Sequence, residues 1–458
     1  MTKKFYQIES PAMQMEKMRE IDLKKMFNDP EIKEALIKAD EDYLHWEQLK
    51  YKNWIPQNVG VNKSDIDKEL FWTLVRINRF FNAIDTPIRD SKGNFFKMNT
   101  HNYNKFLHIV DKEMAGNFMG ISGLSENDKK KFIKRSIIEE SIASSQLEGA
   151  NTSRAVAKRM LLEGRGPVDL SERMIVNAHK TMLKIEQEYY KENLSWNLIS
   201  ELHSMITDQT LPKEKQGVLR ETLDENGNKL VVNTPDNRAI AYETPNKEFV
   251  ESELLRLIDF ANDKEEQPSA FIHPLLKAIM IHFWIGLLHP FEDGNGRLAR
   301  ILFYWYMLKN DYWAFAYLSL SEKIKKSPKQ YSLAYIYSEQ EGSDLTYFIN
   351  YNINKIKLAQ KDFQSYIIKK VKENQSIVAF SQHQQNFNER QMKLLQYLNR
   401  EIESRTNIVS HMTIYSIQKA TAITDLKDLV EKGFLVKRKQ GRNVFYYPTE
   451  KIKSVFKF

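Results

Sequence analysis

Most of the hydrophobic pattern along this chain has helical character. Apolar residues recur at intervals of three and four in the runs around 71–75 and 132–142, and the runs 279–288 and 301–307 are apolar almost throughout. The first kind of spacing places apolar side chains on one face of a helix, and the second is typical of helices buried on all sides. The chain is therefore predicted to be mainly α-helical.

Strand patterns are few. Gly217–Arg220 and Leu230–Thr234 flank a turn-rich stretch at Asp224–Asn228 that contains Asn-Gly, which predicts a β-hairpin. Phe95–Met98 follows a turn and predicts a short strand.

The C-terminal region has a pattern of its own. Helices are predicted at 389–399, 412–418 and 420–431, and a hairpin at 433–448. This order resembles a winged helix, with Thr421, Thr424, Lys427 and Lys432 on or near its recognition helix and basic residues at the hairpin, namely Lys437, Arg438, Lys439 and Arg442. Such modules bind DNA or dock proteins, and both readings stay open.

Composition narrows the function classes. The chain has 458 residues, enough for several domains, and a formal net charge of +8, which favours an acidic partner or nucleic acid. The absence of cysteine excludes disulfides, thiolate metal sites and cysteine catalysis, and it suits a cytoplasmic location. No apolar run approaches the roughly 20 residues that span a bilayer, so no membrane association is expected.

The stretch His289–Arg300 carries the densest polar chemistry, between two apolar helical runs. Gly294 and Gly296 permit backbone angles closed to other residues, so the main chain can approach a ligand closely. A helix that begins near Asn295 points its unpaired N–H groups and positive dipole end at an anion. The stretch therefore predicts a site for a phosphorylated ligand.

The charged side chains of the same stretch refine that prediction. Arg297 and Arg300 share one helix face and can both bind phosphate oxygens. The Asp293 carboxylate suits a magnesium ion that keeps most of its waters and bridges phosphates. His289 has an unperturbed pKa near neutral pH, which suits a general base. Together they indicate a site that binds a nucleotide phosphate chain and activates a nucleophile.

The stretch 289–300 resembles the signature of the Fic family at every fixed position. Its sequence is His-Pro-Phe-Glu-Asp-Gly-Asn-Gly-Arg-Leu-Ala-Arg. The resemblance implies an all-α core that transfers AMP from ATP to a Tyr, Ser or Thr hydroxyl of a target protein and releases pyrophosphate. It implies that His289 is the base and that Asp293 holds Mg²⁺ or Mn²⁺. The remaining implied ligands of ATP are Gly294, Asn295 and Gly296 at the α-phosphate, Arg297 and Arg300 at the distal phosphates, and Tyr331 at the adenine.

A second motif lies upstream. Ser144 and Glu148 are four residues apart, which places them on one helix face, and Gly149 suits a helix end. Ser-x-x-x-Glu-Gly resembles the inhibitory-helix motif of the Fic family. The resemblance implies that Glu148 pairs with Arg300 and blocks productive seating of the γ-phosphate. In an alternative reading, the same glutamate orients a water that removes AMP.

The family resemblance also assigns the hairpin. In Fic proteins a hairpin here is a flap that docks the target segment by strand addition, which assigns Val231, Val232 and Asn233 to that role. The target is a protein, with the chain itself as one candidate. The sequence leaves the oligomeric state open, with a homodimer as one option because such inhibitory helices often occur in homodimers. The competing hypothesis is an ATP-sensing, DNA-binding regulator that transfers nothing.

These predictions divide the chain into four parts: an N-terminal helical extension resembling that of some bacterial Fic proteins (1–125), a Fic domain (126–370) with an inhibitory helix (132–150) and a catalytic loop (289–300), a polar linker (371–386), and a winged-helix-like domain (387–458).

Overall fold

The structure, a computed structural model, describes residues 3–19, 27–55, 68–99, 103–115, 126–264, 271–381, 387–400, 405–415, 417–441 and 443–452. Within these ranges helices dominate, and the named strands form three separate two-stranded sheets. The predicted mainly-α fold is therefore observed. Among the described helices, none is long and apolar enough to cross a membrane.

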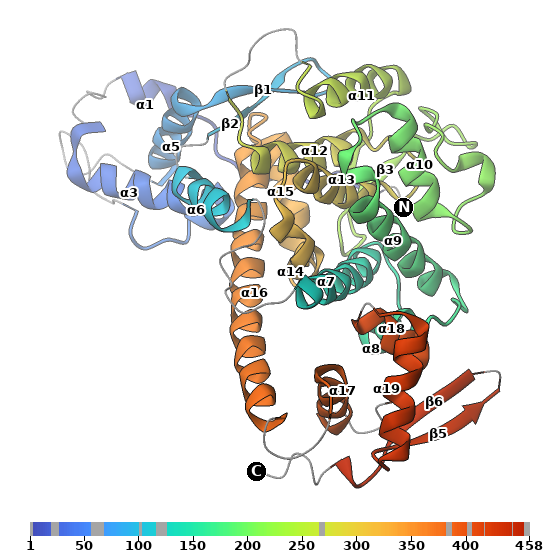
Figure 1. The fold of residues 1–458 in the computed structure, drawn as a ribbon. Helices are drawn as coiled ribbons and strands as arrows, with labels where there is room; N and C mark the ends of the chain where they lie inside the picture. Colours follow the sequence, from blue (N-terminus) through green and yellow to red (C-terminus); the bar gives the residue numbers. More distant parts are fainter. Residues whose placement is uncertain are drawn as a thin grey trace.

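The consecutive helices α12 (Pro274–Leu288) and α13 (Asn295–Lys309) pack against each other in the middle of the helical core (Figure 1). Nearly all of their side chains are buried, as expected for helices that are apolar on every side. The other helices of this part of the molecule are α7 (Glu126–Leu147), α8 (Arg154–Glu163), α9 (Leu170–Gln187), α10 (Trp196–Thr207), α11 (Lys247–Ala261), α14 (Leu320–Lys325), α15 (Pro328–Gln340) and α16 (Thr346–Ser381), with the short helices η2 (Tyr189–Lys191), η3 (Lys213–Lys215) and η4 (Trp313–Tyr317).

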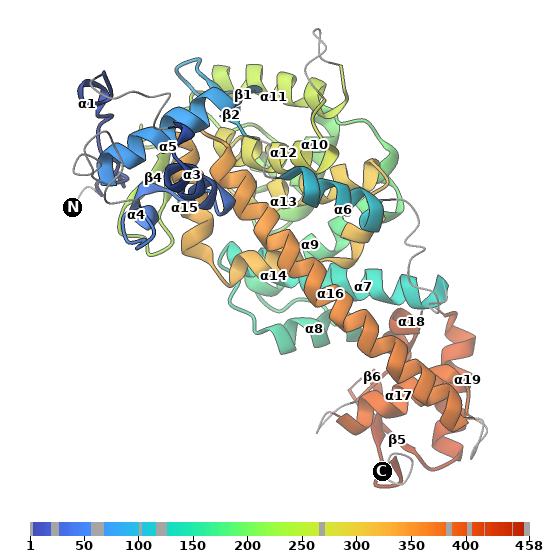
Figure 2. The same cartoon turned by 90° about the vertical axis from the view of Figure 1, so that its left-hand side faces the viewer.

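The N-terminal extension has a small core of its own, which includes the fully buried Trp72 and Ile32. Figure 2 shows it at the end of α16 that lies away from the C-terminal domain. Its elements are α1 (Met15–Arg19), α3 (Pro30–Glu41), α4 (Trp46–Leu49) and α5 (Lys68–Asn82). The strands β1 (Ile84–Arg89) and β2 (Phe95–Met98) and the helix α6 (Asn104–Met114) lie within the predicted extension but pack into the main core. The strand predicted at 95–98 is confirmed.

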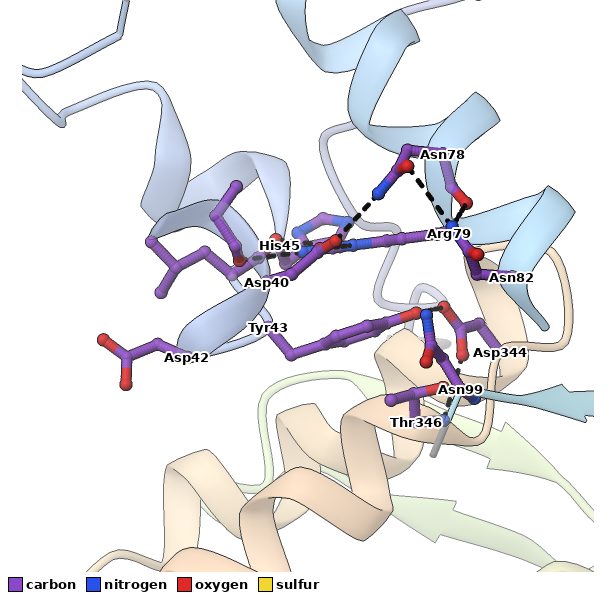
Figure 3. Close-up of polar contacts among 12 residues, drawn as sticks. Asp40, Asp42, Tyr43, His45, Asn78, Arg79, Asn82, Asn99, Asp344 and Thr346 are labelled. Carbon is purple, nitrogen blue, oxygen red and sulfur yellow. Dashed lines mark hydrogen bonds and ion pairs between the residues drawn. The ribbon is translucent and has the colours of Figure 1, made fainter. Parts of the chain in front are cut away.

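A buried polar junction joins this extension to the helical core (Figure 3). The buried guanidinium of Arg79 donates from Nε to Asp40 Oδ1 at 2.7 Å and from Nη1 to Tyr347 Oη at 3.0 Å. Tyr43 Oη donates to Asp344 Oδ2 at 2.6 Å. Because buried charges are tolerated only when paired, these contacts fix the extension in one position on the core.

Three helices and a hairpin follow α16, in the predicted order: α17 (Glu389–Arg400), α18 (Ile408–Tyr415), α19 (Lys419–Glu431), β5 (Leu435–Gln440) and β6 (Asn443–Pro448). The middle helix begins at Ile408 and ends at Tyr415, earlier than the predicted 412–418. We refer to residues 387–452 as the C-terminal domain; its winged-helix identity stays a prediction.

The segment predicted as a linker is mostly helical. Helix α16 continues to Ser381, so residues 371–381 extend the helix instead of forming an irregular connection, while 382–386 lie outside the described residues. The reason is local: 371–381 contains neither glycine nor proline, and its Lys, Glu, Gln and Ala residues have good helix propensity.

Candidate active site

The predicted catalytic loop lies between the two central helices. His289 ends α12 in a left-handed conformation with φ 48°, and Gly294 precedes α13 with φ 86°. The structure thus begins α13 at Asn295, as the sequence predicted. The unpaired N–H groups of its first turn face the loop, which is the geometry of an anion site.

Phe291 anchors the loop in the core, since its side chain is completely buried. Its ring stacks on the imidazole of His203, with centroids 3.7 Å apart. The side chain of Asn295 accepts from the N–H of Phe291 at 2.9 Å and donates to its carbonyl at 2.7 Å. The Asn295 amide therefore shapes the loop, and any contact of this residue with a phosphate comes from its backbone N–H.

His203, which the sequence analysis did not single out, braces the loop through both ring nitrogens. Its Nε2 donates to the carbonyl of Asp293 at 2.8 Å, and its Nδ1 accepts from the N–H of Gly217 at 2.8 Å. Burial lowers its pKa to about 4, so the ring is neutral at neutral pH. A histidine within an apolar helix, α10, was the only signal in the sequence.

His289 has the protonation state of a base. Its Nδ1 lies 3.3 Å from the carbonyl of Gly286; since a carbonyl only accepts, Nδ1 carries the proton and Nε2 is the basic nitrogen. Burial lowers the pKa of His289, with the Gly286 contact acting in the opposite direction. The ring is therefore neutral at neutral pH.

A second residue outside the predicted set, Arg220, clamps the turn at His289. Its Nε donates to the carbonyl of His289 at 2.6 Å, and its Nη2 donates to the carbonyls of Leu288 at 3.3 Å and Pro245 at 2.8 Å. The carbonyls of Leu288 and His289 lie at the end of α12, where they lack partners within the helix, and Pro245 precedes α11. Arg220 thereby fixes the backbone at His289.

The two signature arginines differ in their surroundings. Arg297 is completely buried and donates from Nη1 to the carbonyl of Ile206 at 2.8 Å and from Nη2 to Asp293 Oδ2 at 3.3 Å. Its observed role is to brace the loop and orient Asp293. Within the described part of the chain, Nε of Arg297 and Nη1 of Arg300 have no hydrogen-bond partner, so each retains a buried donor.

Arg300 contacts the upstream motif, as predicted. Its Nε donates to Ser144 Oγ at 2.9 Å, and its Nη2 donates to the Ser144 carbonyl at 3.0 Å and to Glu148 Oε1 at 2.9 Å. Burial alone would lower the pKa of Arg300, but the Glu148 carboxylate outweighs it and the pKa is raised. Helix α7 ends at Leu147, Glu148 follows in the turn, and Gly149 has φ 96°.

The carboxylate of Glu148 lies at the start of α13, where the anion site is predicted. A Cβ placed on Gly296 would lie 2.2 Å from Glu148 Oε1, which means that the carboxylate rests directly against the glycine backbone at the start of α13. Only glycine at 296 leaves room for an anion this close. Glu148 thus occupies the place where the helix end favours negative charge.

Helix α7 has a further anchor that the sequence analysis missed. Glu140 is buried and accepts from the N–H of Ser321 at 2.9 Å and from Ser319 Oγ at 3.1 Å. Burial raises its pKa. These bonds fix α7 against the start of α14, and so set the position of Ser144 and Glu148.

The metal prediction rests on Asp293, whose side chain is 55% exposed. Within the described residues no three His, Asp or Glu side chains gather closely enough to hold an ion. A single accessible carboxylate fits a Mg²⁺ ion that keeps several waters and takes its other ligands from nucleotide phosphates.

Tyr331 lies beside the site, within an aromatic group. Its hydroxyl is 2.8 Å from His282 Nε2, and its ring contacts Tyr335 and Tyr351 with centroids 5.4 and 5.8 Å away. Its assignment to the adenine pocket stays a prediction.

The hairpin beside the site pairs differently from the prediction. Strand β3 (Val231–Asn233) pairs with β4 (Ile240–Glu243), whereas 217–220 is not a strand. The predicted Asn-Gly turn forms, since Asp224 N–H donates to the Asn228 carbonyl at 2.7 Å, but it closes only an isolated bridge. Tertiary contacts explain the difference: Gly217 and Arg220 are bound to His203 and the catalytic loop instead.

The outer edge of β4 is already paired. Residues near the N-terminus add to it: the N–H of Tyr6 donates to the Ile240 carbonyl at 2.8 Å, and the N–H of Ile240 donates to the Lys4 carbonyl at 3.0 Å. The three residues predicted to dock a target, Val231, Val232 and Asn233, all lie on the other strand of the hairpin.

In the C-terminal domain, Lys437, Arg438 and Lys439 are exposed on β5, as a binding surface requires. Thr424 and Lys427 are exposed on α19, whereas Lys432 pairs with Asp428 at 2.7 Å. Arg442 lies outside the described residues.

Comparison with known proteins identifies the region that contains the loop. Residues 193–307 match the Fic/DOC family. The protein adenylyltransferase fic-1 of Caenorhabditis elegans is 35% identical over 65 residues, which cover 14% of this chain and 12% of that protein. Its Caenorhabditis briggsae counterpart is 34% identical over 65 residues, with the same coverage. A solved Fic family protein from Desulfovibrio desulfuricans G20 is 16% identical, with 76% of this chain and 95% of that chain covered at a TM-score of 0.47.

Proposed function

Because residues 193–307 belong to the Fic/DOC family, we propose that the chain is a protein adenylyltransferase. A hydroxyl oxygen of the target attacks the α-phosphorus of ATP, and the bond from that phosphorus to the bridging β-phosphate oxygen breaks. His289 Nε2 takes the hydroxyl proton, and pyrophosphate leaves with the bonding electrons. The observation that carries this proposal is a neutral, oriented imidazole beside a glycine-lined helix N-terminus.

The phosphates are assigned to the start of α13. The backbone N–H groups of 294–296 favour the α-phosphate, and the buried, incompletely paired donors of Arg297 and Arg300 favour the phosphates beyond it. Asp293 is the residue that would hold Mg²⁺ or Mn²⁺, an ion that neutralises phosphate charge when bound. The target segment is assigned to β3, since the edge of β4 is taken by residues 4–6.

The resting site is proposed to be inhibited by Glu148. Its carboxylate is bonded to Arg300 and rests against Gly296, so a nucleotide phosphate competes with it for the same donors. The Glu148 side chain is 26% exposed, so the pair is only partly buried. If opening it costs about 3 kcal/mol, the lower end of the range for breaking a buried ion pair, productive seating of ATP is disfavoured roughly a hundredfold.

The test uses ATP labelled at the α- or the γ-phosphate, with magnesium, the wild-type chain and Glu148→Gly. We expect label to enter protein only from the α position, and roughly ten- to a hundredfold faster in Glu148→Gly. His289→Ala should abolish transfer and leave ATP binding intact. Equal rates in wild type and Glu148→Gly would refute the inhibition.

The same experiment separates the alternatives. Label from the γ position would indicate a kinase. ATP binding without any transfer would favour the nucleotide-sensing regulator. Release of AMP from a modified protein by wild type, lost in Glu148→Gly, would assign the glutamate to hydrolysis.

A further inference from the structure

Helix α8, which follows the Glu148 turn, is capped at its carboxyl end by the C-terminal domain (Figure 1). Ser410 Oγ donates to the Leu162 carbonyl at 2.9 Å, and Asn407 Nδ2 donates to the Glu163 carbonyl at 3.4 Å. Arg405 donates to both carboxylate oxygens of Glu163, from Nε at 2.9 Å and Nη2 at 3.1 Å. The final carbonyls of a helix lack partners within it, and here a separate domain supplies them.

Helix α8 is in turn tied to α7. Glu139 on α7 accepts from Arg154 Nε at 2.6 Å and from Lys158 Nζ at 3.1 Å, both on α8. Apolar side chains of the two helices share one buried cluster, which includes Ile138, Ile142, Ala157 and Met160. Glu148 lies in the short connection between these helices, so a displacement of α8 is passed to the residue that occupies the anion site.

Most of the net positive charge of the chain lies at its C-terminal end. Residues 387–458 contain 14 Lys and Arg against 7 Asp and Glu, a net +7 out of +8 for the whole sequence. Three of these cations lie exposed and consecutive on β5. The same hairpin reaches the contact with α8, because Arg405 Nη1 donates to Gln440 Oε1 on β5 at 2.9 Å and to Tyr447 Oη on β6 at 3.3 Å.

We propose that duplex DNA bound to this basic surface weakens the hold of the C-terminal domain on α8 and thereby the Glu148–Arg300 pair, an inference that rests on the proposed function. The exposed α19 and the β5–β6 ribbon have the dimensions that enter a major groove. DNA phosphates attract Lys437, Arg438 and Lys439 and compete with Glu163 for Arg405. DNA is favoured over an acidic protein because Lys437, Arg438 and Lys439 are adjacent in β5, and this strand contains no carboxylate.

The test measures the Kd of ATP for the full-length chain with and without a mixed-sequence duplex of about 25 base pairs. We expect DNA to tighten ATP binding roughly tenfold, and ATP to tighten DNA binding by the same factor, since coupling is reciprocal. DNA affinity should fall steeply between about 50 and 200 mM salt.

Three variants test the route of the coupling. The Glu163→Gln variant should bind ATP more tightly than wild type without DNA, and its affinity for ATP should change little when DNA is added. Glu148→Gly should not respond, and the exposed Glu192→Gln should behave as wild type.

A duplex that binds without changing the Kd of ATP would overturn the coupling. No binding at about 50 mM salt would overturn the DNA assignment and leave an acidic protein as the ligand of this surface. Because the readout is ATP affinity, it is independent of transfer. A coupling observed in a chain that transfers no AMP would refute the proposed function while the inference on DNA stands.

Discussion

At the scale of single residues, the protonation states of His289 and Arg300 define the chemistry of the site. His289 is kept neutral by burial, and its Nδ1 contact with Gly286 directs the basic nitrogen away from its own helix. Burial alone would lower the pKa of Arg300, but neighbouring groups, with Glu148 first among them, raise it, so its guanidinium is charged. One group is prepared to accept a proton and the other to bind an anion, as transfer of a charged group to a hydroxyl requires.

The fall of the transfer rate at low pH should therefore follow protonation of His289. Transfer requires the neutral imidazole, and burial lowers its pKa from the ordinary value of about 6.5. We expect kcat of Glu148→Gly to be level through neutral pH and to fall only below about pH 6.5. An acid limb centred above that value would show that the imidazole is not held in the neutral form described.

At the scale of elements, the ends of helices create the site. The end of α12 presents His289, the start of α13 presents its N–H groups, and the end of α7 presents Glu148. Polar side chains fix two of these helices: Arg220 holds the end of α12, and Glu140 on α7 joins that helix to α14.

The Arg220→Met variant tests the hydrogen bonds that hold the end of α12. It removes the donors to four backbone carbonyls, which should lower the free energy of unfolding by about 2–4 kcal/mol. Because the turn at His289 loses its support, kcat should fall more than tenfold, while the Kd of ATP changes little. Urea denaturation and ATP titration measure both effects. Arg238→Met, at a side chain that is 87% exposed, is the stability control; equal losses in the two variants would refute the clamp.

At the scale of the whole molecule, α7 and α8 connect the catalytic loop to the C-terminal domain, and the N-terminal residues connect the extension to the hairpin. The core between them contains histidines that are buried in the neutral form. Burial lowers the pKa of His203 to about 4, and burial, with Arg300 beside it, lowers that of His282 to about 3.

Stability should consequently decline in mild acid. The unfolded chain takes up protons at these histidines near pH 6.5, whereas the folded chain does so only near pH 3 to 4. Their contribution is complete above about pH 6.5 and is lost as the pH falls towards 4. Wild type should lose unfolding free energy between pH 7 and pH 5, and His203→Gln or His282→Gln should lose about 1–2 kcal/mol less than wild type over the same range. Urea denaturation at both pH values measures this, and the exposed His108→Gln should match wild type.

The sequence by itself determined whatever local pattern controls. The apolar runs on either side of 289–300 predicted two buried helices, and glycine, histidine and arginine at fixed spacing predicted the loop and its polarity. The four-residue spacing of Ser144 and Glu148 predicted a shared face, and both side chains do meet Arg300. These features depend on neighbours within a few residues, so periodicity and motif suffice to find them.

Only the tertiary structure decided which distant segments meet. Hairpin pairing failed at 217–220 because Gly217 and Arg220 gain more from His203 and the catalytic loop than from a strand partner. The roles of His203, Arg220 and Glu140, and the seat of the C-terminal domain on α8, arise from burial and hydrogen bonds between residues up to hundreds of positions apart. No local pattern encodes such contacts, because their free energy comes from satisfying polar groups that become buried only once the chain has folded.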